Sequence, residues 1–432
     1  MLLAALVVVL SLLAAKPAHA AATFNINSTG DAGDDNPGNG SCFTGVLIPG
    51  SGVGLELECT LRAAMEEANA TTTPDTISFN IPGAGPHTIS PATALPAITQ
   101  PLTINGYSQP GASVNTATTG TNAVLKIVLR GSNAPDTAAG LRITIGSTVK
   151  GLVINGFSTG VILNDVEGDF WSTLEGNFIG TDATGNRAIA NRRSGVNTLR
   201  CGVDIIGGDT LAARNLISGN GRDGIKTDST LCSNVVEGNL IGTTKDGTTA
   251  LGNGFFGVAV AGGGQQIWRN TIAFNGGHGV FVSSGNQNAI LSNSIHSNGG
   301  LGIDLRGGTE NAAGVTANDH GDFDSGPNHL QNRPIITDAT TSGTTTNISG
   351  RLNSLPNQFF FLQFFSNPSG GNEGQRLIGA SNVKTDVNGN VRFTFAPAGK
   401  VSVGRTITAT ASLSDDTSEF SAPRTVGAVI GP

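Results

Sequence analysis

The chain has 432 residues, with 62 glycines, 13% charged residues and a formal net charge of −7. Glycine is at about twice, and charge at about half, the share usual in globular proteins, which excludes coiled coils and helical bundles. The negative charge and the lack of a Lys/Arg block exclude an ordinary nucleic-acid-binding protein. Disorder is excluded because hydrophobic residues reach 38% and follow a clear period.

The first residues predict an export signal. Residues 2–15 form an apolar run, which is followed by the small-residue site Ala18-His19-Ala20. The run is too short to span a membrane and is typical of a secretory signal over residues 1–20. No second apolar run of spanning length follows. We therefore expect a secreted or cell-surface protein with no membrane span in the mature chain.

The four cysteines are expected to pair, because disulfides persist in exported proteins. Cys42 and Cys59 are close in sequence, and a bond between them would close a loop worth about 3 kcal/mol through the entropy of the unfolded chain. Cys201 and Cys232 are then the second predicted pair. The clustered Cys/His ligands of a metal site are absent from the sequence.

Residues 21–75 are expected to form an N-terminal capping segment. Residues 31–54 are rich in Gly, Asn and Asp and read as a loop, whereas residues 60–69 (TLRAAMEEAN) predict a short amphipathic helix. Thr60 is the expected N-cap. The apolar face consists of Leu61, Ala64, Met65 and Ala68. The ends of a solenoid expose strand edges, so we expect this helix to cover the first coil.

Residues 76–328 repeat a short pattern, in which an Asn and an apolar residue are followed by a Gly-rich turn and Gly-Val or Gly-Ile. Successive asparagines are 22, 38, 24, 31 and 23 residues apart, at Asn155, Asn177, Asn215, Asn239, Asn270 and Asn293. A period of about 22 to 24 residues with insertions indicates a solenoid. The leucine-rich signature is missing, which favours a right-handed parallel β-helix. We interpret the asparagines as a structural ladder at one corner.

The same repeat places the second pair of cysteines together. Gly195-Val196 and Gly224-Ile225 open equivalent strands of neighbouring coils, and Cys201 and Cys232 follow six and eight residues downstream. Adjacent coils are about 4.8 Å apart, within reach of a disulfide.

Residues 329–432 lose the period and predict an antiparallel β-sandwich of the immunoglobulin or fibronectin kind. Apolar or alternating segments at 348–352, 359–365, 391–395 and 406–410 are separated by turns such as Asn388-Gly389. The phenylalanines of these segments are interpreted as core residues. The complete chain is therefore expected to be all-β, with a capped parallel β-helix followed by a sandwich.

The segment from Cys59 to Asn69 resembles the CSLREA domain, which is found at the N-termini of exported bacterial proteins. Thr60 and Ala63 depart from the motif, and the matching positions are Cys59, Leu61, Arg62 and Ala64. The segments GNFIGTDATGN, RNLISGNGRDGI and GNLIGTTKDGTTALGNG are similar to right-handed β-helix repeats that accompany such domains. The resemblance extends to residues 318–332 and the sandwich. It implies a bacterial surface or secreted protein without a settled biochemical activity.

The weak catalytic candidates are His278 and Asp223. Gly277-His278-Gly279 looks like an element of polygalacturonase-type hydrolases, but the accompanying aspartate and Arg-Ile-Lys elements are missing from the repeats. In coil register Asp223 lies two coils from His278, on the order of 9.6 Å away, beyond hydrogen-bond reach. On the outward strand positions Asp228 and Asp304 are about 14 Å apart, whereas glycosidases need carboxyl groups roughly 5 to 9.5 Å apart.

No cofactor is expected other than structural calcium. Asp319, Asp322 and Asp324 form an oxygen-rich loop suited to a hard cation, with a plain acidic turn as the alternative interpretation. The loop that contains Asp31, Asp34 and Asp35 is a weaker candidate for the same role.

The favoured function is non-catalytic. We expect an adhesin-like or matrix-binding solenoid, with an extracellular polysaccharide or a cell-surface protein as partner and no nucleic acid. One alternative is a β-helix polysaccharide lyase or glycoside hydrolase acting on an acidic polysaccharide. The other alternative is a structural spacer in the cell envelope.

Overall fold

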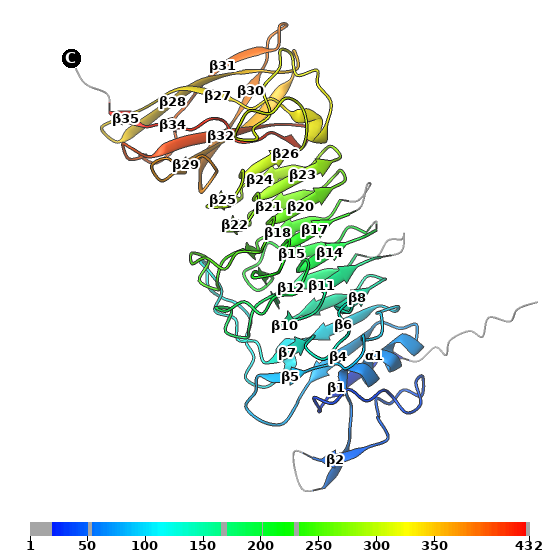
Figure 1. The fold of residues 1–432 in the computed structure, drawn as a ribbon. Coiled ribbons are helices and arrows are strands. Elements are labelled where there is room, and N and C mark those ends of the chain that lie inside the picture. Colours follow the sequence, from blue (N-terminus) through cyan, green and yellow to red (C-terminus); the bar gives the residue numbers. More distant parts are fainter. Residues whose placement is uncertain (1–19, 51–53, 166–170, 201, 229–232, 429–432) are drawn as a thin grey trace, which may run out of the picture.

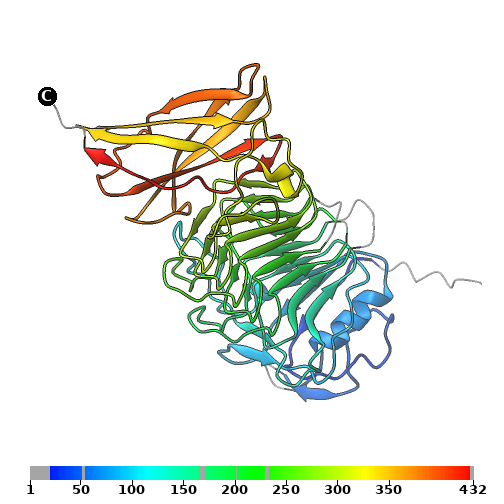
Figure 2. The ribbon, with the colours of Figure 1, turned by 45° about the horizontal axis from the view of Figure 1, so that its top comes forward.

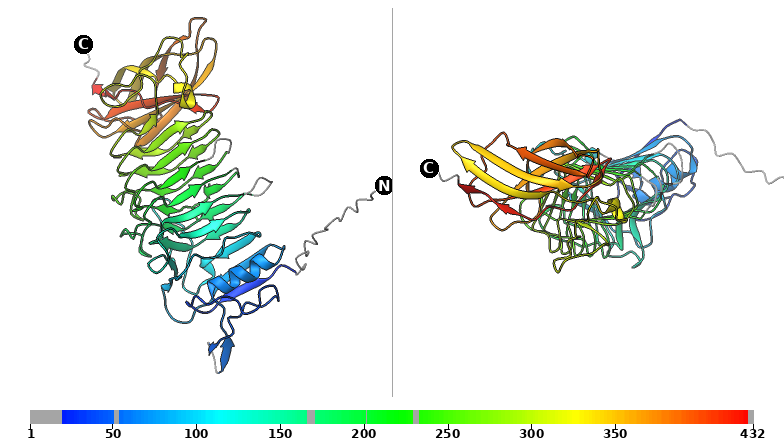
Figure 3. Two further views of the ribbon diagram at one scale, coloured as in Figure 1. Left: turned by 45° about the vertical axis from the view of Figure 1, so that its right-hand side comes forward. Right: turned by 90° about the horizontal axis from the view of Figure 1, so that it is seen from above.

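The computed structural model describes residues 20–50, 54–165, 171–200, 202–228 and 233–428. These residues form a long stack of β-coils, with one helix beside the first coils and a β-sandwich on the last (Figure 1). The end-on view in Figure 3 shows the sandwich lying over the C-terminal end of the stack. The predicted right-handed parallel β-helix with a helical cap and a C-terminal sandwich is confirmed.

Three parallel sheets form the walls of the solenoid, and a complete coil adds one short strand to each wall (Figure 2). The nine-stranded wall contains, in order, β1 (Thr23–Ile26), β4 (Asp75–Phe79), β6 (Leu102–Asn105), β9 (Thr148–Lys150), β12 (Thr173–Glu175), β15 (Ile205–Gly207), β18 (Val235–Glu237), β21 (Gln266–Trp268) and β24 (Ala289–Leu291). The eight-stranded wall contains β5 (His87–Ile89), β7 (Ile127–Arg130), β10 (Leu152–Asn155), β13 (Phe178–Ile179), β16 (Leu216–Ile217), β19 (Leu240–Ile241), β22 (Thr271–Ala273) and β25 (Ser294–His296). The seven-stranded wall contains β8 (Ala139–Ile143), β11 (Thr159–Leu163), β14 (Val196–Thr198), β17 (Ile225–Thr227), β20 (Val258–Ala261), β23 (Val280–Ser284) and β26 (Ile303–Leu305).

Stacked apolar rows fill the interior, because alternate residues of a strand point to opposite faces. In the seven-stranded wall one inward row consists of Val161, Val196, Ile225, Val258, Val280 and Ile303, which pair in register. All of these side chains are buried. The interior is therefore one continuous hydrophobic core along the solenoid.

Columns of polar side chains occupy the turns between the walls. In the first column each amide donates to the side-chain oxygen of the next, through Asn177, Asn215, Asn239, Asn270 and Asn293. Asn155 was expected in this column but lies outside it. Leu152 stands at the equivalent position and donates its N–H to Asn177 Oδ1, whereas the Asn155 amide, at the far end of β10, donates to the Thr181 carbonyl.

Two further columns occupy the other corners of the coils. The second is made of asparagines alone, namely Asn191, Asn220, Asn253, Asn275 and Asn298. The third is mixed and runs through Ser147, Ser172, Asp204, Asn234, Gln265, Asn288 and Asn328. Together the three columns satisfy buried backbone groups at every turn, which burial would otherwise leave unpaired at a cost in stability.

The N-terminal cap is built on α1 (Leu61–Ala70), as predicted, with Thr60 accepting a hydrogen bond from the Ala63 N–H as the N-cap. Leu61, Ala64, Met65 and Ala68 pack into the solenoid core. The hairpin of β2 (Leu47–Pro49) and β3 (Leu55–Leu57) precedes the helix. The predicted disulfide between Cys42 and Cys59 is present.

Loops cover the outer face of the eight-stranded wall. The sister insertions 181–191 and 243–253 each form a small bridge, and together with residues around the 3₁₀ turn η1 (Gly106–Ser108) they bury an outer apolar cluster. Phe178, Leu216 and Leu240 belong to this cluster. In contrast, the outer face of the seven-stranded wall carries polar and aromatic side chains that reach solvent.

The sandwich consists of two mainly antiparallel sheets. One contains β31 (Asn390–Phe395), β28 (Thr345–Asn353), β27 (Ile335–Ser342) and β35 (Gly427–Ala428). The other contains β30 (Arg376–Lys384), β29 (Phe359–Asn367), β32 (Thr406–Leu413), β33 (Asp416–Thr417) and β34 (Arg424–Thr425). Phe360, Phe364 and Phe393 lie in its core, whereas Phe359 is 66% exposed.

The sandwich closes the C-terminal end of the solenoid. Phe365 and Phe420 belong to the solenoid core rather than to the core of the sandwich. All three wall edges gain partners: the Ile290 N–H donates to Thr417, Ile295 pairs with Gly374, and the Leu305 N–H donates to Glu419. No helix among the described residues is long and apolar enough to cross a membrane.

Candidate functional site

Four rings gather on the outer face of the seven-stranded wall, and we call them the aromatic shelf: Phe255, Phe256, His278 and Phe281. The Phe256 and Phe281 rings stack with centroids 4.5 Å apart, and His278 stacks on Phe256 at 5.3 Å. The Phe255 ring is 4.1 Å from Phe256 and is 43% exposed. The Arg222 guanidinium lies 5.9 Å from the Phe255 centroid, in cation–π range.

Strand register explains why the shelf forms. Phe281 occupies the outward position of β23, directly beside Ala259 of β20, whose small side chain leaves room for the Phe256 ring. His278 and Phe256 precede the glycines at which their two strands begin, so they stand on successive coils. The shelf is therefore a product of the coil repeat.

Both ring nitrogens of His278 are engaged. Nδ1 accepts a hydrogen bond from the Leu301 N–H at 2.8 Å, so in the neutral ring the proton is on Nε2. That nitrogen lies 3.1 Å from Oδ2 of Asp304, which is buried on the neighbouring strand. Burial raises the pKa of Asp304, while His278 opposes that rise. A ring held in this way has no free nitrogen with which to act as a general base.

Asp223 is likewise committed to local structure. It is buried, and its carboxylate accepts from the Phe256 N–H at 3.3 Å and from the Ser194 hydroxyl at 3.3 Å. The register places it two coils from His278, through β17, β20 and β23. The structure thus brings neither Asp223 and His278 together nor Asp228 and Asp304, which lie three coils apart.

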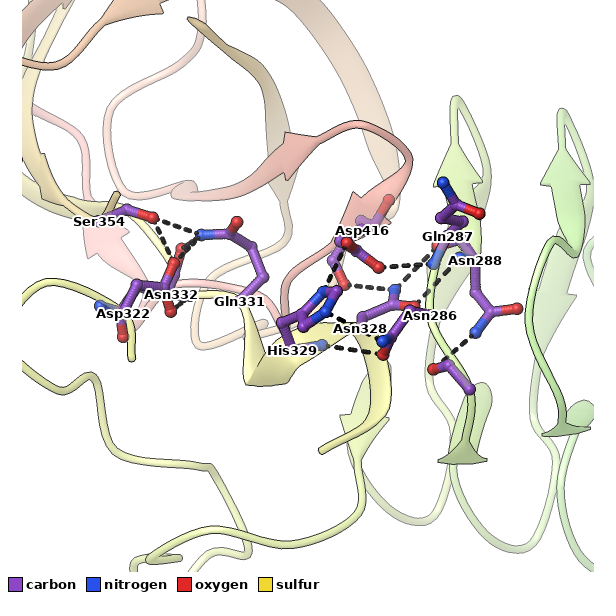
Figure 4. Close-up of polar contacts among 12 residues, drawn as sticks. Asn286, Gln287, Asn288, Asp322, Asn328, His329, Gln331, Asn332, Ser354 and Asp416 are labelled. Atoms are coloured by element: carbon purple, nitrogen blue, oxygen red, sulfur yellow. Dashed lines mark hydrogen bonds and ion pairs between the residues drawn. The ribbon is translucent and has the colours of Figure 1, made fainter. Parts of the chain in front are cut away.

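A second candidate lies at the junction of solenoid and sandwich. Ligand oxygens of Asp319, Asp322 and Asp324 converge to within 4.8 Å of one another. The Asp322 carboxylate is buried and accepts from Gln331, Ser354 and the Asn332 N–H (Figure 4). The arrangement supplies a compact set of hard oxygen ligands, which suits Ca²⁺.

The electrostatics of this junction cluster favour a cation. Burial raises the pKa of Asp322 to about 6, and the Asp319 and Asp324 carboxylates add to the rise. The pKa of Asp324 is raised by burial and by Asp319. Asp324 Oδ1 is buried and has no hydrogen-bond partner. A cation would relieve both the mutual repulsion and the unpaired oxygen.

Beside the junction cluster lies a cavity of about 600 Å³, lined in part by Asp322, Phe323, Asp324, His329 and Asp416. His329, in the 3₁₀ turn η2 (Pro327–Leu330), contacts Asp416 through Nδ1 at 2.9 Å (Figure 4). Asp416 also accepts from the Gln287 N–H at 2.6 Å and thereby links the sandwich to the solenoid. The Phe323 ring at the cavity is 74% exposed.

Two further predicted sites are the acidic N-terminal loop and the second cysteine pair. Asp31 forms an ion pair with Arg62 at 2.9 Å, and Asp34 accepts from the Asn36 and Phe43 N–H groups. Within the described ranges, the carboxylates that converge as a metal site are those of the junction cluster and not those of this loop. Cys201 and Cys232 lie outside the described residues.

A buried carboxyl pair was missed by the sequence analysis. Asp165 and Asp204 lie within hydrogen-bonding reach of each other, and burial followed by the Asp165 charge raises the pKa of Asp204 to about 8. Asp204 stands in the third polar column. Because that column mixes four residue types, the repeat gave no signal for it.

The sequence matches no protein-family model and no curated protein significantly. Among solved structures, the chain is similar to the enzymatically active domain of bacteriophage CBA120 tailspike protein 4, with 11% identity and a TM-score of 0.19. The match covers 83% of this chain and 64% of the tailspike chain, so this chain spans less than two thirds of its length. At this TM-score the similarity carries no conclusion about activity.

Proposed function

We propose that the protein is a secreted or cell-surface solenoid that binds polysaccharide without cleaving it. The observation that carries the proposal is the aromatic shelf, a partly exposed group of rings on the outer face of the seven-stranded wall. Aromatic faces offer a large apolar contact area to the CH faces of sugar rings. Both the His278 nitrogens and the Asp223 carboxylate are already hydrogen-bonded, which supports binding over cleavage.

The test combines co-sedimentation with a measurement of new chain ends, on a panel of neutral and acidic polysaccharides. We expect the protein to bind at least one polysaccharide without producing new ends. Phe255→Ala and Phe281→Ala should each weaken this binding about tenfold, and Phe359→Ala serves as the control because its exposed ring lies on the sandwich.

Three results would contradict the proposal. New chain ends would favour a lyase or hydrolase, and the catalytic carboxylates would then be sought in the loops. Equal binding by the shelf variants and the control would remove the shelf as the binding surface. The absence of all binding would favour the structural spacer or a protein partner.

We also propose a structural calcium ion at the junction cluster. The three converging carboxylates and the unpartnered Asp324 Oδ1 support it. Binding to the folded state alone stabilises a protein by about 2.7 kcal/mol at a hundredfold excess over the dissociation constant. We expect calcium to raise the melting temperature over a chelator, Asp324→Asn to abolish this difference and the exposed Asp338→Asn to retain it. Identical melting curves with calcium and chelator would reject the ion.

The N-terminal cap supports the proposals of export and of a CSLREA-like segment. Cys59 forms a disulfide, Leu61 is buried in the core, and Arg62 pairs with Asp31 and donates to the carbonyls of Thr93 and Ala94. These three of the four matching residues therefore hold the cap or its loops in place, and the fourth, Ala64, is buried in the core. A secretion assay with and without residues 1–20 tests the export, and retention of the full chain in the cytoplasm would contradict it.

A further inference from the structure

The sandwich contains a basic hollow that is separate from the aromatic shelf and the junction cluster. It has a volume of about 530 Å³, and its charged lining residues are Arg376, Lys400 and Arg405. The lining includes no Asp or Glu side chain. In a chain with a net charge of −7, a hollow with three cations and no carboxylate is an unusual concentration of positive charge.

The three cations are not neutralised within the described part of the molecule. None of them takes part in the ion pairs formed there. Arg405 is half-buried, and its guanidinium is held by the Ser366 hydroxyl at 2.8 Å and the Ser366 carbonyl at 3.4 Å. Ser366 in turn pairs with Arg376 across β29 and β30. Arg376 on β30 and Arg405 just before β32 therefore lie on either side of Ser366 of β29, and the Arg405 guanidinium is held there by hydrogen bonds.

The rest of the lining is suited to a sugar rather than to a bare ion. Leu377, Ile378 and Pro397 give the hollow an apolar side, and Gln375 and Ser402 add polar groups. A volume of about 530 Å³ is far larger than a sulfate or phosphate ion and falls within the usual range of ligand sites. Planar guanidinium groups recognise carboxylates and sulfates by paired hydrogen bonds.

We propose that this basic hollow binds the carboxylate or sulfate groups of an acidic polysaccharide. The proposal rests on the proposed polysaccharide-binding function for its ligand class. The basic hollow would be a second contact surface for the polysaccharide, and it would select anionic chains. Neutral chains would use the aromatic shelf alone, whereas acidic chains would use both surfaces.

The experiment measures the affinity of the full chain for polygalacturonate, chondroitin sulfate and neutral dextran across a range of salt concentrations. The test variant is Arg376→Gln with Lys400→Gln, two exposed residues whose replacement leaves the core intact. The matched control is Arg351→Gln with Arg392→Gln, which removes the same charge from exposed positions on the other sheet of the sandwich. Arg405→Gln is a second test variant, with its melting curve recorded alongside.

We expect the test variant to lose at least tenfold in affinity for one or both acidic chains and to depend less on salt, whereas the control stays within twofold. Equal losses in test and control variants, or none, would overturn the proposal, as would binding of free inorganic sulfate without any binding of the polymers. Binding of a polynucleotide in place of both acidic polysaccharides would also overturn it.

The two proposals fail in distinguishable ways. If only the basic hollow is wrong, polysaccharide binding persists and is sensitive to Phe255→Ala but not to the arginine and lysine variants. If the polysaccharide-binding function is wrong, none of the polymers binds to the unaltered chain.

Discussion

Asp204 occupies a rung of the third polar column at which other coils place an amide or a hydroxyl. Its Oδ1 accepts from the Ser172 N–H, while Asp165 Oδ1 and Asp204 Oδ2 are buried without any other hydrogen-bond partner. Because the two carboxyl groups lie within hydrogen-bonding reach of each other, a proton kept by the pair would be shared between them. Burial and the charge of Asp165 raise the pKa of Asp204 to about 8, so the pair is expected to keep one proton at neutral pH.

This pair predicts a stability that decreases as the pH rises. An Asp in the unfolded chain loses its proton near its ordinary pKa of 3.8, whereas folded Asp204 keeps it until about pH 8. Between those values the folded state binds more protons, so the free energy of unfolding falls as the pH rises. Asp204→Asn, which supplies a permanent donor to the column, is expected to reduce this fall between pH 5 and 8.

The measurement is urea unfolding at intervals of half a pH unit. The exposed Asp338→Asn is the control and should follow the unaltered chain. Burial also raises the pKa of Glu419 to about 7, so some pH dependence should survive in Asp204→Asn. A curve for Asp204→Asn that coincides with that of the control would contradict the shared proton.

At the scale of the elements, the asparagine columns connect one coil to the next. Asn239 donates to the Ile206 carbonyl and to Asn270, and it accepts from Asn215, so it contacts both the preceding and the following coil. Asn155 has a single side-chain bond to a carbonyl, at Thr181, and a long contact of 3.4 Å from Arg130. The two residues have the same chemistry in different surroundings.

Asn239→Ala is therefore expected to destabilise the fold by about 2 to 4 kcal/mol, because it leaves several buried groups without partners at about 1 to 3 kcal/mol each. Asn155→Ala should cost about half as much or less. Chemical denaturation of both variants measures the difference. Equal losses would mean that the column adds nothing beyond a local turn contact.

The N-terminal cap gives a prediction at the same scale. Removing the disulfide with Cys42→Ser and Cys59→Ser is expected to cost about 3 kcal/mol, from the entropy of a loop with a sequence separation of 17. Limited proteolysis should then cut the loop of residues 31–45 first. A variant as stable and as protease-resistant as the oxidised protein would show that the helix alone secures the cap.

On the scale of the whole molecule, solenoid and sandwich share a core. Phe420 lies against Gly302 of the last coil and stacks edge-on with Phe365 at 5.3 Å between centroids. The two parts also exchange hydrogen bonds at each wall edge. This contact predicts that they unfold together.

The tryptophans make this prediction measurable, because Trp171 and Trp268 both belong to the solenoid and the sandwich has none. We expect the thermal midpoint from tryptophan fluorescence to coincide with that from far-UV circular dichroism. Phe420→Ala should lower both midpoints together, in line with the cost of about 3 to 5 kcal/mol for emptying a buried Phe site. The exposed Phe359→Ala should lower neither. Two separate midpoints in the unaltered chain would contradict a shared core.

The predictability of each feature follows from how regularly it recurs. The walls and five rungs of the first column were predicted because the same residue type returns once per coil at a fixed offset, and the helix was predicted from its own amphipathic pattern. The second column has a comparable signal, a recurring Asn-Gly at 220, 253, 275 and 298, which is also the pattern of the Gly-rich turns. The third column mixes Ser, Asp, Asn and Gln, so no single residue type returns at every coil.

The His278–Asp304 contact and the basic hollow depend on neighbours that the repeat does not encode. His278 was compared with Asp223, which shares its position in the repeat, whereas its partner Asp304 lies at a different offset on the following coil. The basic hollow joins β29, β30 and the segment that precedes β32, which are distant in sequence. The junction cluster was found because its three aspartates are close along the chain.

The covered ends of the solenoid have a consequence for how its length can change. A bare parallel stack is a template on which further strands can add, as in a growing fibril. Here α1 packs its apolar face into the core at one end, and the sandwich supplies partners to all three wall edges at the other, so among the described residues the C-terminal end does not present a bare stack to further copies of the chain. Duplicating one inner coil would lengthen the rod by about 4.8 Å and leave both end pieces as they are. The coil is thus the natural increment by which the reach of this molecule can vary.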